Sequence, residues 1–173
     1  MKLIILLILL IFSSLMAENN LSSSVSIKTS FVKTSRNTNL QEVLKQKFIP
    51  SKTTNFGFYD GAIWEKIELS NLENSSKTLY ATTFRTTLDY VDAYITDNNS
   101  IVASYLLGDM REIENSETRI LNFPIQLNSN QNLTIYIKHQ NYRGVIEANW
   151  NFLDQISMKY LIFYDSLFFG ALS

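Results

Sequence analysis

The chain has 173 residues, is 46% hydrophobic, and carries 15 basic and 16 acidic side chains for a net charge of -1. This length predicts a single domain with a substantial core, and the near-neutral charge argues against a nucleic-acid partner, because such proteins present basic surfaces. Since there is no cysteine and only one histidine, we expect no disulfide, no transition-metal site and no bound cofactor.

The first 17 residues have the three parts of a secretory signal peptide. These parts are the positive charge of Lys2, an apolar stretch from Leu3 to Phe12, and small residues ending at Ala17. We expect export and cleavage after Ala17. Because Leu15 is large for its position before the cut, a retained membrane anchor is the alternative. Export without cysteine favours a bacterial periplasm, since small extracellular domains often depend on disulfides.

Residues 18–37 are rich in Ser, Thr and Asn, which is typical of a flexible lead or of a weak edge strand. A short amphipathic helix is predicted next, because Thr38 or Asn39 can cap a first turn and Pro50 ends the segment. Its residues at helical spacing are Leu40, Val43, Leu44 and either Lys47 or Phe48.

The pattern then changes to a period of two, which indicates β-strands. Seven runs of strand length lie at residues 62–72, 78–84, 88–97, 101–107, 119–127, 132–140 and 145–153. Polar turn sequences separate them, and crossover helices are missing, so we predict an all-β antiparallel β-sandwich or jelly roll. Turn or structural roles are expected for Gly57, Gly61, Gly108, Asp109 and Gly144.

One face of the predicted sheet collects flat rings and charged groups. Its residues, predicted to bind a ligand, are Trp64, Lys66, Glu68, Tyr90, Asp92, Tyr94, Tyr136 and Lys138. Rings stack on sugars and charged groups bind hydroxyls, so this face suits a carbohydrate or another small polar ligand. The alternative is an ordinary solvent-facing side of a sandwich, where aromatic and charge pairs are common. The loops at 141–144 and 108–118 are further candidates.

Catalytic chemistry has less support, and we expect no enzyme. His139 ends a predicted strand, where a partly exposed imidazole is expected. The acidic pairs Glu112 with Glu114 and Asp89 with Asp92 are close in sequence, but nothing indicates that either pair meets across a cleft. A periplasmic glycoside hydrolase is therefore the weakest alternative.

Several segments occur in a familiar order. They are NLQEVLKQKFIP, NFGFYDGAIWEKIELSNLENSSKTLYA, LDYVDAYITDNN, LLGDMREIENSETRILNFPIQLNSNQNLTIYIKHQN and YDSLFFGALS. This order resembles the type 2 extracellular domain of bacterial seven-transmembrane receptors with diverse intracellular signalling modules, and Gly61, Trp64, Gly108 and Asp109 match its pattern. The resemblance implies a periplasmic jelly-roll sensor, similar to carbohydrate-binding modules. It also implies that seven membrane helices follow, with an output module such as a histidine kinase or a diguanylate cyclase. It transfers no ligand contacts.

The expected organisation is a sensor domain at 38–156 followed at 157–173 by the start of a truncated first transmembrane helix. The apolar stretch from Tyr160 is shorter than the roughly 20 residues that a membrane span needs. We therefore expect a ligand-sensing ectodomain that faces or is attached to the inner membrane. The alternative is an interaction domain without a small ligand, which pairs with itself or another protein through a sheet edge or the aromatic face.

Overall fold

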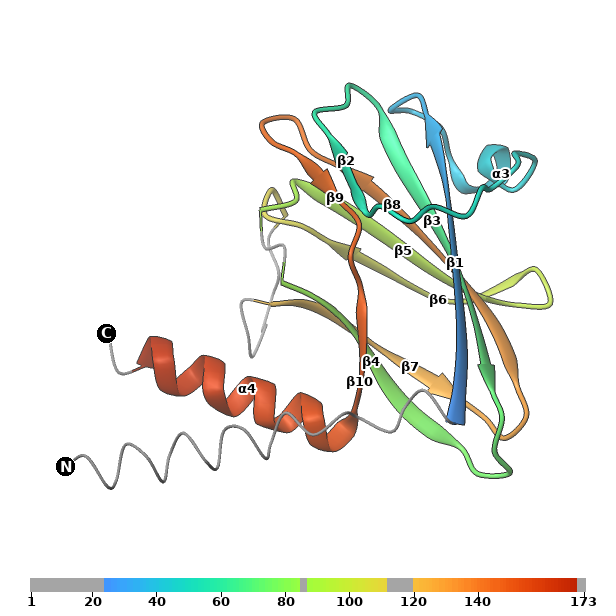
Figure 1. Cartoon of the computed structure of the whole chain (residues 1–173), viewed down its shortest axis with the longest axis vertical. Helices are drawn as coiled ribbons and strands as arrows, with labels where there is room; N and C mark the ends of the chain where they lie inside the picture. Colours follow the sequence, from blue (N-terminus) through green and yellow to red (C-terminus); the bar gives the residue numbers. More distant parts are fainter. Residues whose placement is uncertain (1–23, 85–86, 112–119, 171–173) are drawn as a thin grey trace.

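The computed structural model describes residues 24–84, 87–111 and 120–170 (Figure 1). The strands are β1 (Val25–Thr34), β2 (Asn55–Gly57), β3 (Ala62–Asn71), β4 (Lys77–Thr83), β5 (Tyr90–Asp97), β6 (Ser100–Leu107), β7 (Leu121–Leu127), β8 (Asn132–Gln140), β9 (Ile146–Glu147) and β10 (Asn151–Asp154). The helices are α3 (Leu40–Val43) and α4 (Gln155–Gly170). The signal peptide expected at 1–17 lies outside the described residues.

The strands pair antiparallel throughout the described sheets. One sheet has the order β1-β3-β8-β5-β6, a second has the order β10-β4-β7, and β2 pairs with β9 (Figure 1). The main core contains buried side chains from the first two sheets, including Ile67 and Ile135 from one and Phe123 and Ile125 from the other. The prediction of a mainly antiparallel β fold with a short N-terminal helix is therefore confirmed.

The alternation of apolar and polar residues along β5 determines which side chains face the core and which face the other side of the sheet. Val91, Ala93 and Ile95 are buried in the core, whereas the residues between them point to the opposite face of the sheet. Burial of a large aliphatic side chain such as Ile95 contributes about 1.5–3 kcal/mol. A shift of the register by one residue would expose this apolar set, so the pattern holds β5 in place.

Of the two readings expected for residues 18–37, a flexible lead or a weak edge strand, the described part follows the second. Residues 25–34 form β1, an edge strand that pairs with β3 along its whole length. Only Val25 and Phe31 supply large, fully buried side chains, so the strand carries little hydrophobic signal in its sequence. Its backbone pairing with β3 and the core contact of Phe31 order it instead.

The helix α3 begins where the sequence predicts. The Asn39 side chain accepts a hydrogen bond from the backbone N–H of Glu42, and the Glu42 carboxylate accepts one from the backbone N–H of Asn39. The helix is shorter than expected, because the backbone N–H groups of Lys45 and Gln46 bond three residues back and the chain then extends. Ile49 forms two backbone hydrogen bonds with Phe31, at the edge of β1.

The helix α4 follows β10 directly and extends away from the sheets (Figure 1). The carboxylate of Asp154 accepts a hydrogen bond from the backbone N–H of Ser157, which caps the first turn. Met158 is buried against the domain, whereas four apolar residues of α4 are exposed, namely Ile156, Tyr160, Phe163 and Leu167. Within the described part of the chain, no helix combines the length and apolar character needed to cross a membrane.

A tight turn at residues 108–111 follows β6 and packs against the segment that leads into β5. Gly108 has a φ of +123°, and a Cβ atom at this position would lie 2.4 Å from the backbone oxygen of Asp89. A non-glycine residue at position 108 would therefore strain the backbone and push the two segments apart. This turn fixes where Arg111 enters the outer face of the sheet.

Candidate functional site

The eight residues predicted to bind a ligand share the outer face of the five-stranded sheet. They are Trp64, Lys66 and Glu68 on β3, Tyr90, Asp92 and Tyr94 on β5, and Tyr136 and Lys138 on β8. The strand register places them in cross-strand rows, one of which contains Trp64, Lys138 and Asp92. The structure therefore brings together the residues that the sequence pattern grouped on one face, although they differ in exposure.

Trp64 is fully buried beneath α3. It has an exposed fraction of 0% and packs in a cluster with Val43 and Tyr136. Its ring stacks on Tyr94 at 6.1 Å between ring centroids, and the Lys138 ammonium lies 5.8 Å from its ring centroid. Because no face of the ring is open, Trp64 holds α3 on the sheet in this arrangement and presents no surface for a sugar to stack on.

A groove of about 410 Å³ lies beside this covered region, between the sheet and the segment that follows α3. Three of the predicted residues, Lys66, Glu68 and Tyr136, line it. The opposite wall is formed mainly by apolar side chains, Leu44, Phe48 and Pro50, and the β1 side by Lys28, Thr29 and Ser30. The volume is within the usual range of small-molecule sites, and the lining combines one apolar wall with polar and charged groups on the other sides.

The polar groups of the groove are held in place by one another and by the sheet. The ammonium of Lys66 lies 2.8 Å from a carboxylate oxygen of Glu68. Burial raises the pKa of the Tyr136 hydroxyl, an effect that the positive charge of Lys66 opposes and the negative charge of Glu68 reinforces. The Tyr136 ring is supported by Phe48 at 5.8 Å between centroids. Neutral Tyr136 and the ion pair offer both donors and acceptors to hydroxyl groups of a ligand.

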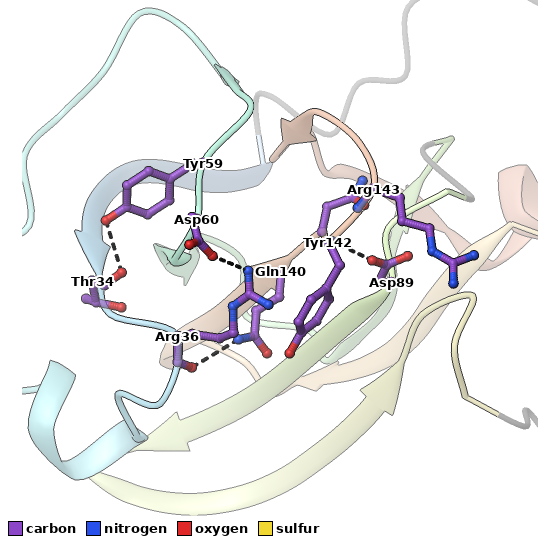
Figure 2. A network of polar contacts seen from close by, with 9 residues as sticks. Thr34, Arg36, Tyr59, Asp60, Asp89, Gln140, Tyr142 and Arg143 are labelled. Carbon is purple, nitrogen blue, oxygen red and sulfur yellow. Dashed lines mark hydrogen bonds and ion pairs between the residues drawn. The ribbon is translucent and has the colours of Figure 1, made fainter.

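A second cluster lies where β1 and β8 end and β3 and β5 begin (Figure 2). The guanidinium of Arg36 forms an ion pair with Asp60 and lies 3.7 Å from the centroid of the Tyr142 ring. The side-chain amide of Gln140 donates a hydrogen bond to the backbone oxygen of Arg36 (Figure 2). Asp89 accepts a hydrogen bond from the backbone N–H of Tyr142 (Figure 2). This loop-end cluster ties four chain segments together.

Arg111 continues the loop-end cluster onto the outer face of the sheet. Its guanidinium pairs with Asp92, donates to the backbone oxygens of Val91 and Leu107 at 2.9 Å each, and lies 5.2 Å from the Tyr90 ring centroid. These contacts occupy N–H donors of the Arg111 guanidinium within the domain. The cluster therefore stabilises the turn at 108–111 and has few free groups for a ligand, which makes the groove the better candidate site.

Two residues on the central part of the outer face have altered acidity. Burial lowers the pKa of Lys138; the nearby carboxylate of Asp92 opposes this shift and the guanidinium of Arg111 adds to it. Burial also raises the pKa of Tyr94. Both residues are partly covered and contact Trp64, so they belong to the packing beneath α3 more than to the groove.

Among the described residues, the candidate catalytic groups do not come together in one site. The expected partial exposure of His139 is wrong: its exposed fraction is 0%, because β8 is a central strand and the imidazole points into the core. There its Nε2 atom lies 3.1 Å from an oxygen of Glu65. Asp89 and Asp92 are occupied in the loop-end contacts. Glu112 and Glu114 lie outside the described residues. Among the residues that are described, no group of three or more potential ligands is placed to hold a metal ion.

The sequence reasoning missed the β1 side of the groove and the loop-end residues Arg36 and Asp60. Lys28 and Ser30 were included in the expected flexible lead or weak edge strand, and neither was considered as a ligand contact. Tyr142 lies in the candidate loop 141–144 and is exposed. No sequence signal indicated Arg36, because its contacts depend on how the ends of β1 and β8 meet.

The chain was compared with protein families, curated proteins and solved structures. The family model described as 7TMR-DISM extracellular 2 matches residues 29–153, well over half of the chain. No curated protein matches the sequence. A crystal structure of a GH31 alpha-xylosidase from Xanthomonas citri is similar with a TM-score of 0.37 and 9% sequence identity; the match covers 76% of this chain and 15% of the xylosidase chain. At that score the structural likeness carries no argument about fold or function.

Proposed function

Because the chain belongs to the 7TMR-DISM extracellular 2 family of receptor sensor domains, we propose that it senses a small polar ligand, most simply a carbohydrate, outside the inner membrane. Family membership places it as an extracellular or periplasmic domain of a membrane receptor, and the ligand, the site and the mode of signalling are our proposals. We also propose that its topology is a jelly roll similar to that of carbohydrate-binding modules.

The observation that carries this proposal is the groove between the sheet and the segment after α3. It combines apolar walls from Leu44, Phe48 and Pro50 with the Lys66–Glu68 ion pair. Sugars present both an apolar ring face and hydroxyl groups, and each type of surface would find a partner here. A ligand in the groove would contact β1, β3, β8 and the segment after α3 at once.

Signal transmission would use the connection between the sheets and α4. β10 pairs with β4 and continues without a loop into α4, so a change in the packing of the domain would reach this helix directly. We propose that α4 leads toward the membrane, as the apolar residues exposed on it suggest. We propose that α4 passes the signal to membrane helices and an output module of the kind that the family implies.

Removing the ion pair of the groove tests the proposed site. The double variant Lys66→Ala with Glu68→Ala keeps the net charge, and we expect it to bind saccharides at least tenfold more weakly, because charge-assisted hydrogen bonds to the ligand are lost. The matched control is Glu73→Ala with Lys77→Ala, which removes an ion pair of similar exposure at 3.0 Å that does not line the groove.

Thermal-shift screening of neutral and acidic saccharides, followed by calorimetric titration, measures the effect. The parent and the control should show the same saturable rise in melting temperature. If no saccharide shifts the parent, or if both double variants bind like the parent, the proposed site is wrong.

A second candidate function, protein association, is favoured by the exposed edge of β6. This edge strand exposes Ile101, Val102 and Leu106, and an apolar edge strand is a ready template for pairing with another chain. We expect Leu106→Lys to abolish any concentration-dependent association, which sedimentation velocity would measure. A parent that sediments as a monomer at all concentrations and retains no partner would remove this candidate.

A further inference from the structure

The charge of the chain is distributed unevenly, and a basic stretch supplies two walls of the groove. Residues 24–53 contain six basic side chains and one acidic side chain, a net charge of +5, whereas the whole chain has a net charge of -1. The basic residues are Lys28, Lys33, Arg36, Lys45, Lys47 and Lys52. This stretch includes β1 and the segment after α3, each of which forms one wall of the groove. Two walls of the groove therefore come from a basic stretch of a slightly negative chain.

Some of these charges are already neutralised or occupied. Arg36 pairs with Asp60, and Lys33 lies over the rings of Phe56 and Tyr59 at 5.9 and 5.2 Å from their centroids. Neither of these two basic residues lines the groove.

Inside the groove, Lys66 is neutralised by Glu68 at 2.8 Å. Lys28 stands opposite Glu68 in the register of β1 and β3, but within the described parts of the chain it forms no ion pair. Lys28 is an exposed residue and lines the groove. The groove thus has one positive charge more than its own acidic group balances.

We propose that the ligand of this groove is an acidic saccharide, with its carboxylate on Lys28 and its ring against the apolar wall. This inference rests on the proposed sensing function and specifies the ligand class for the same site. The surplus positive charge would attract an anionic sugar, and the Lys66–Glu68 pair and Ser30 would bind its hydroxyl groups. A neutral sugar would leave the Lys28 charge unpaired in the complex, so it would bind more weakly.

Titration calorimetry of the full chain tests the inference with uronate trisaccharides and their neutral hexose counterparts. We expect uronates to bind at least tenfold more tightly than the neutral trisaccharides at low salt, with the difference shrinking as sodium chloride is added, because exposed charges are screened within about 10 Å at 0.1 M salt. Lys28→Ala should remove most of this preference. Lys45→Ala removes the same charge from the same basic stretch but not from the groove wall, and it should retain the preference.

The possible results separate the inference from the function on which it rests. Neutral trisaccharides that bind as tightly as uronates would overturn the acidic ligand class while leaving a saccharide-sensing groove. Absence of binding by either set would overturn both. An equal loss of uronate binding in Lys28→Ala and Lys45→Ala would show a diffuse attraction and overturn the assignment to this groove. Melting temperatures of both variants, expected to match the parent, control for folding because both side chains are exposed.

Discussion

Replacing His139 with alanine is expected to lower the free energy of unfolding by about 3–5 kcal/mol. The exposed fractions of His139 and Glu65 are 0% and 3%, and His139 Nε2 lies 3.1 Å from a Glu65 carboxylate oxygen, in the interior of the domain. Removing the imidazole leaves the Glu65 carboxyl without this partner and opens a cavity next to Trp150, whose ring lies 6.2 Å from the imidazole between centroids. Both effects act against folding.

Urea unfolding of single and double variants would measure this coupling. Because each partner alone is costly to bury, Glu65→Leu and His139→Leu should each destabilise the protein, whereas the double variant should lose much less than the sum of the two. We expect the stability of the double variant to approach that of the parent, since buried ion pairs are often replaceable by apolar side chains. Strictly additive losses would show that the two groups do not stabilise each other.

The same pair predicts a pH dependence with a definite sign. Burial raises the pKa of the Glu65 carboxyl, and the hydrogen bond and charge of His139 oppose the shift. A carboxyl whose pKa is higher in the folded state contributes stability that is complete below its unfolded value, near 4.5, and is lost as the pH rises through the folded value.

Relative to Glu65→Gln, which cannot ionise, the parent should therefore lose stability as the pH rises from about 4 toward neutrality. Urea titrations over this range measure the difference in the free energy of unfolding between the parent and Glu65→Gln. Titratable groups that do not interact with Glu65 contribute equally to both proteins and cancel in this difference. A difference that stays constant or grows in favour of the parent would contradict the raised pKa.

Strands with strong alternation were predictable from the sequence, and weakly apolar strands were not. β3 to β8 overlap the first six of the seven predicted runs, with bounds that differ by no more than two residues, and the last run divides into β9 and β10. The three-residue β2 was not predicted, and β1 was expected only as a weak edge strand, with a flexible lead as the alternative. Polar side chains dominate β1, and the backbone pairing that orders it leaves no mark in the composition. A hydrophobic period of two indicates that one face of a strand is buried, but it does not indicate whether a polar strand pairs through its backbone at the edge of a sheet.

Part of the candidate site was likewise predictable from the sequence, and part was not. Period-two alternation correctly grouped Lys66, Glu68 and Tyr136 on one face, since this grouping needs only the geometry of a strand. It could not show that α3 folds over the same face and buries Trp64, because which surface a short helix covers depends on contacts between residues distant in sequence. The burial of His139 was missed for a related reason, since a central position in the sheet follows from strand order and not from local pattern.

Trp64→Ala should be as damaging as the loss of His139, with an expected fall of about 3–5 kcal/mol in the free energy of unfolding. The ring is fully buried, and its removal would leave a cavity between α3 and the sheet, which Val43 alone cannot fill. Among the described contacts, the Trp64 Nε1 atom makes no hydrogen bond, so Trp64→Phe loses volume but no polar partner and should cost less. Phe58→Ala, at a side chain 80% exposed, is the surface control and should change stability by less than about 0.5 kcal/mol.

Chemical unfolding of the three variants distinguishes packing from ligand contact at this position. If Trp64→Ala were as stable as the parent, α3 would not depend on this ring, and Trp64 would again be a candidate for stacking on a sugar. If stability falls as expected, any loss of binding in Trp64→Ala follows from a displaced α3 and a collapsed groove wall at Leu44 and Phe48. Ligand contacts must then be assigned from residues whose replacement leaves the fold intact, which makes Lys28 and the Lys66–Glu68 pair the informative positions.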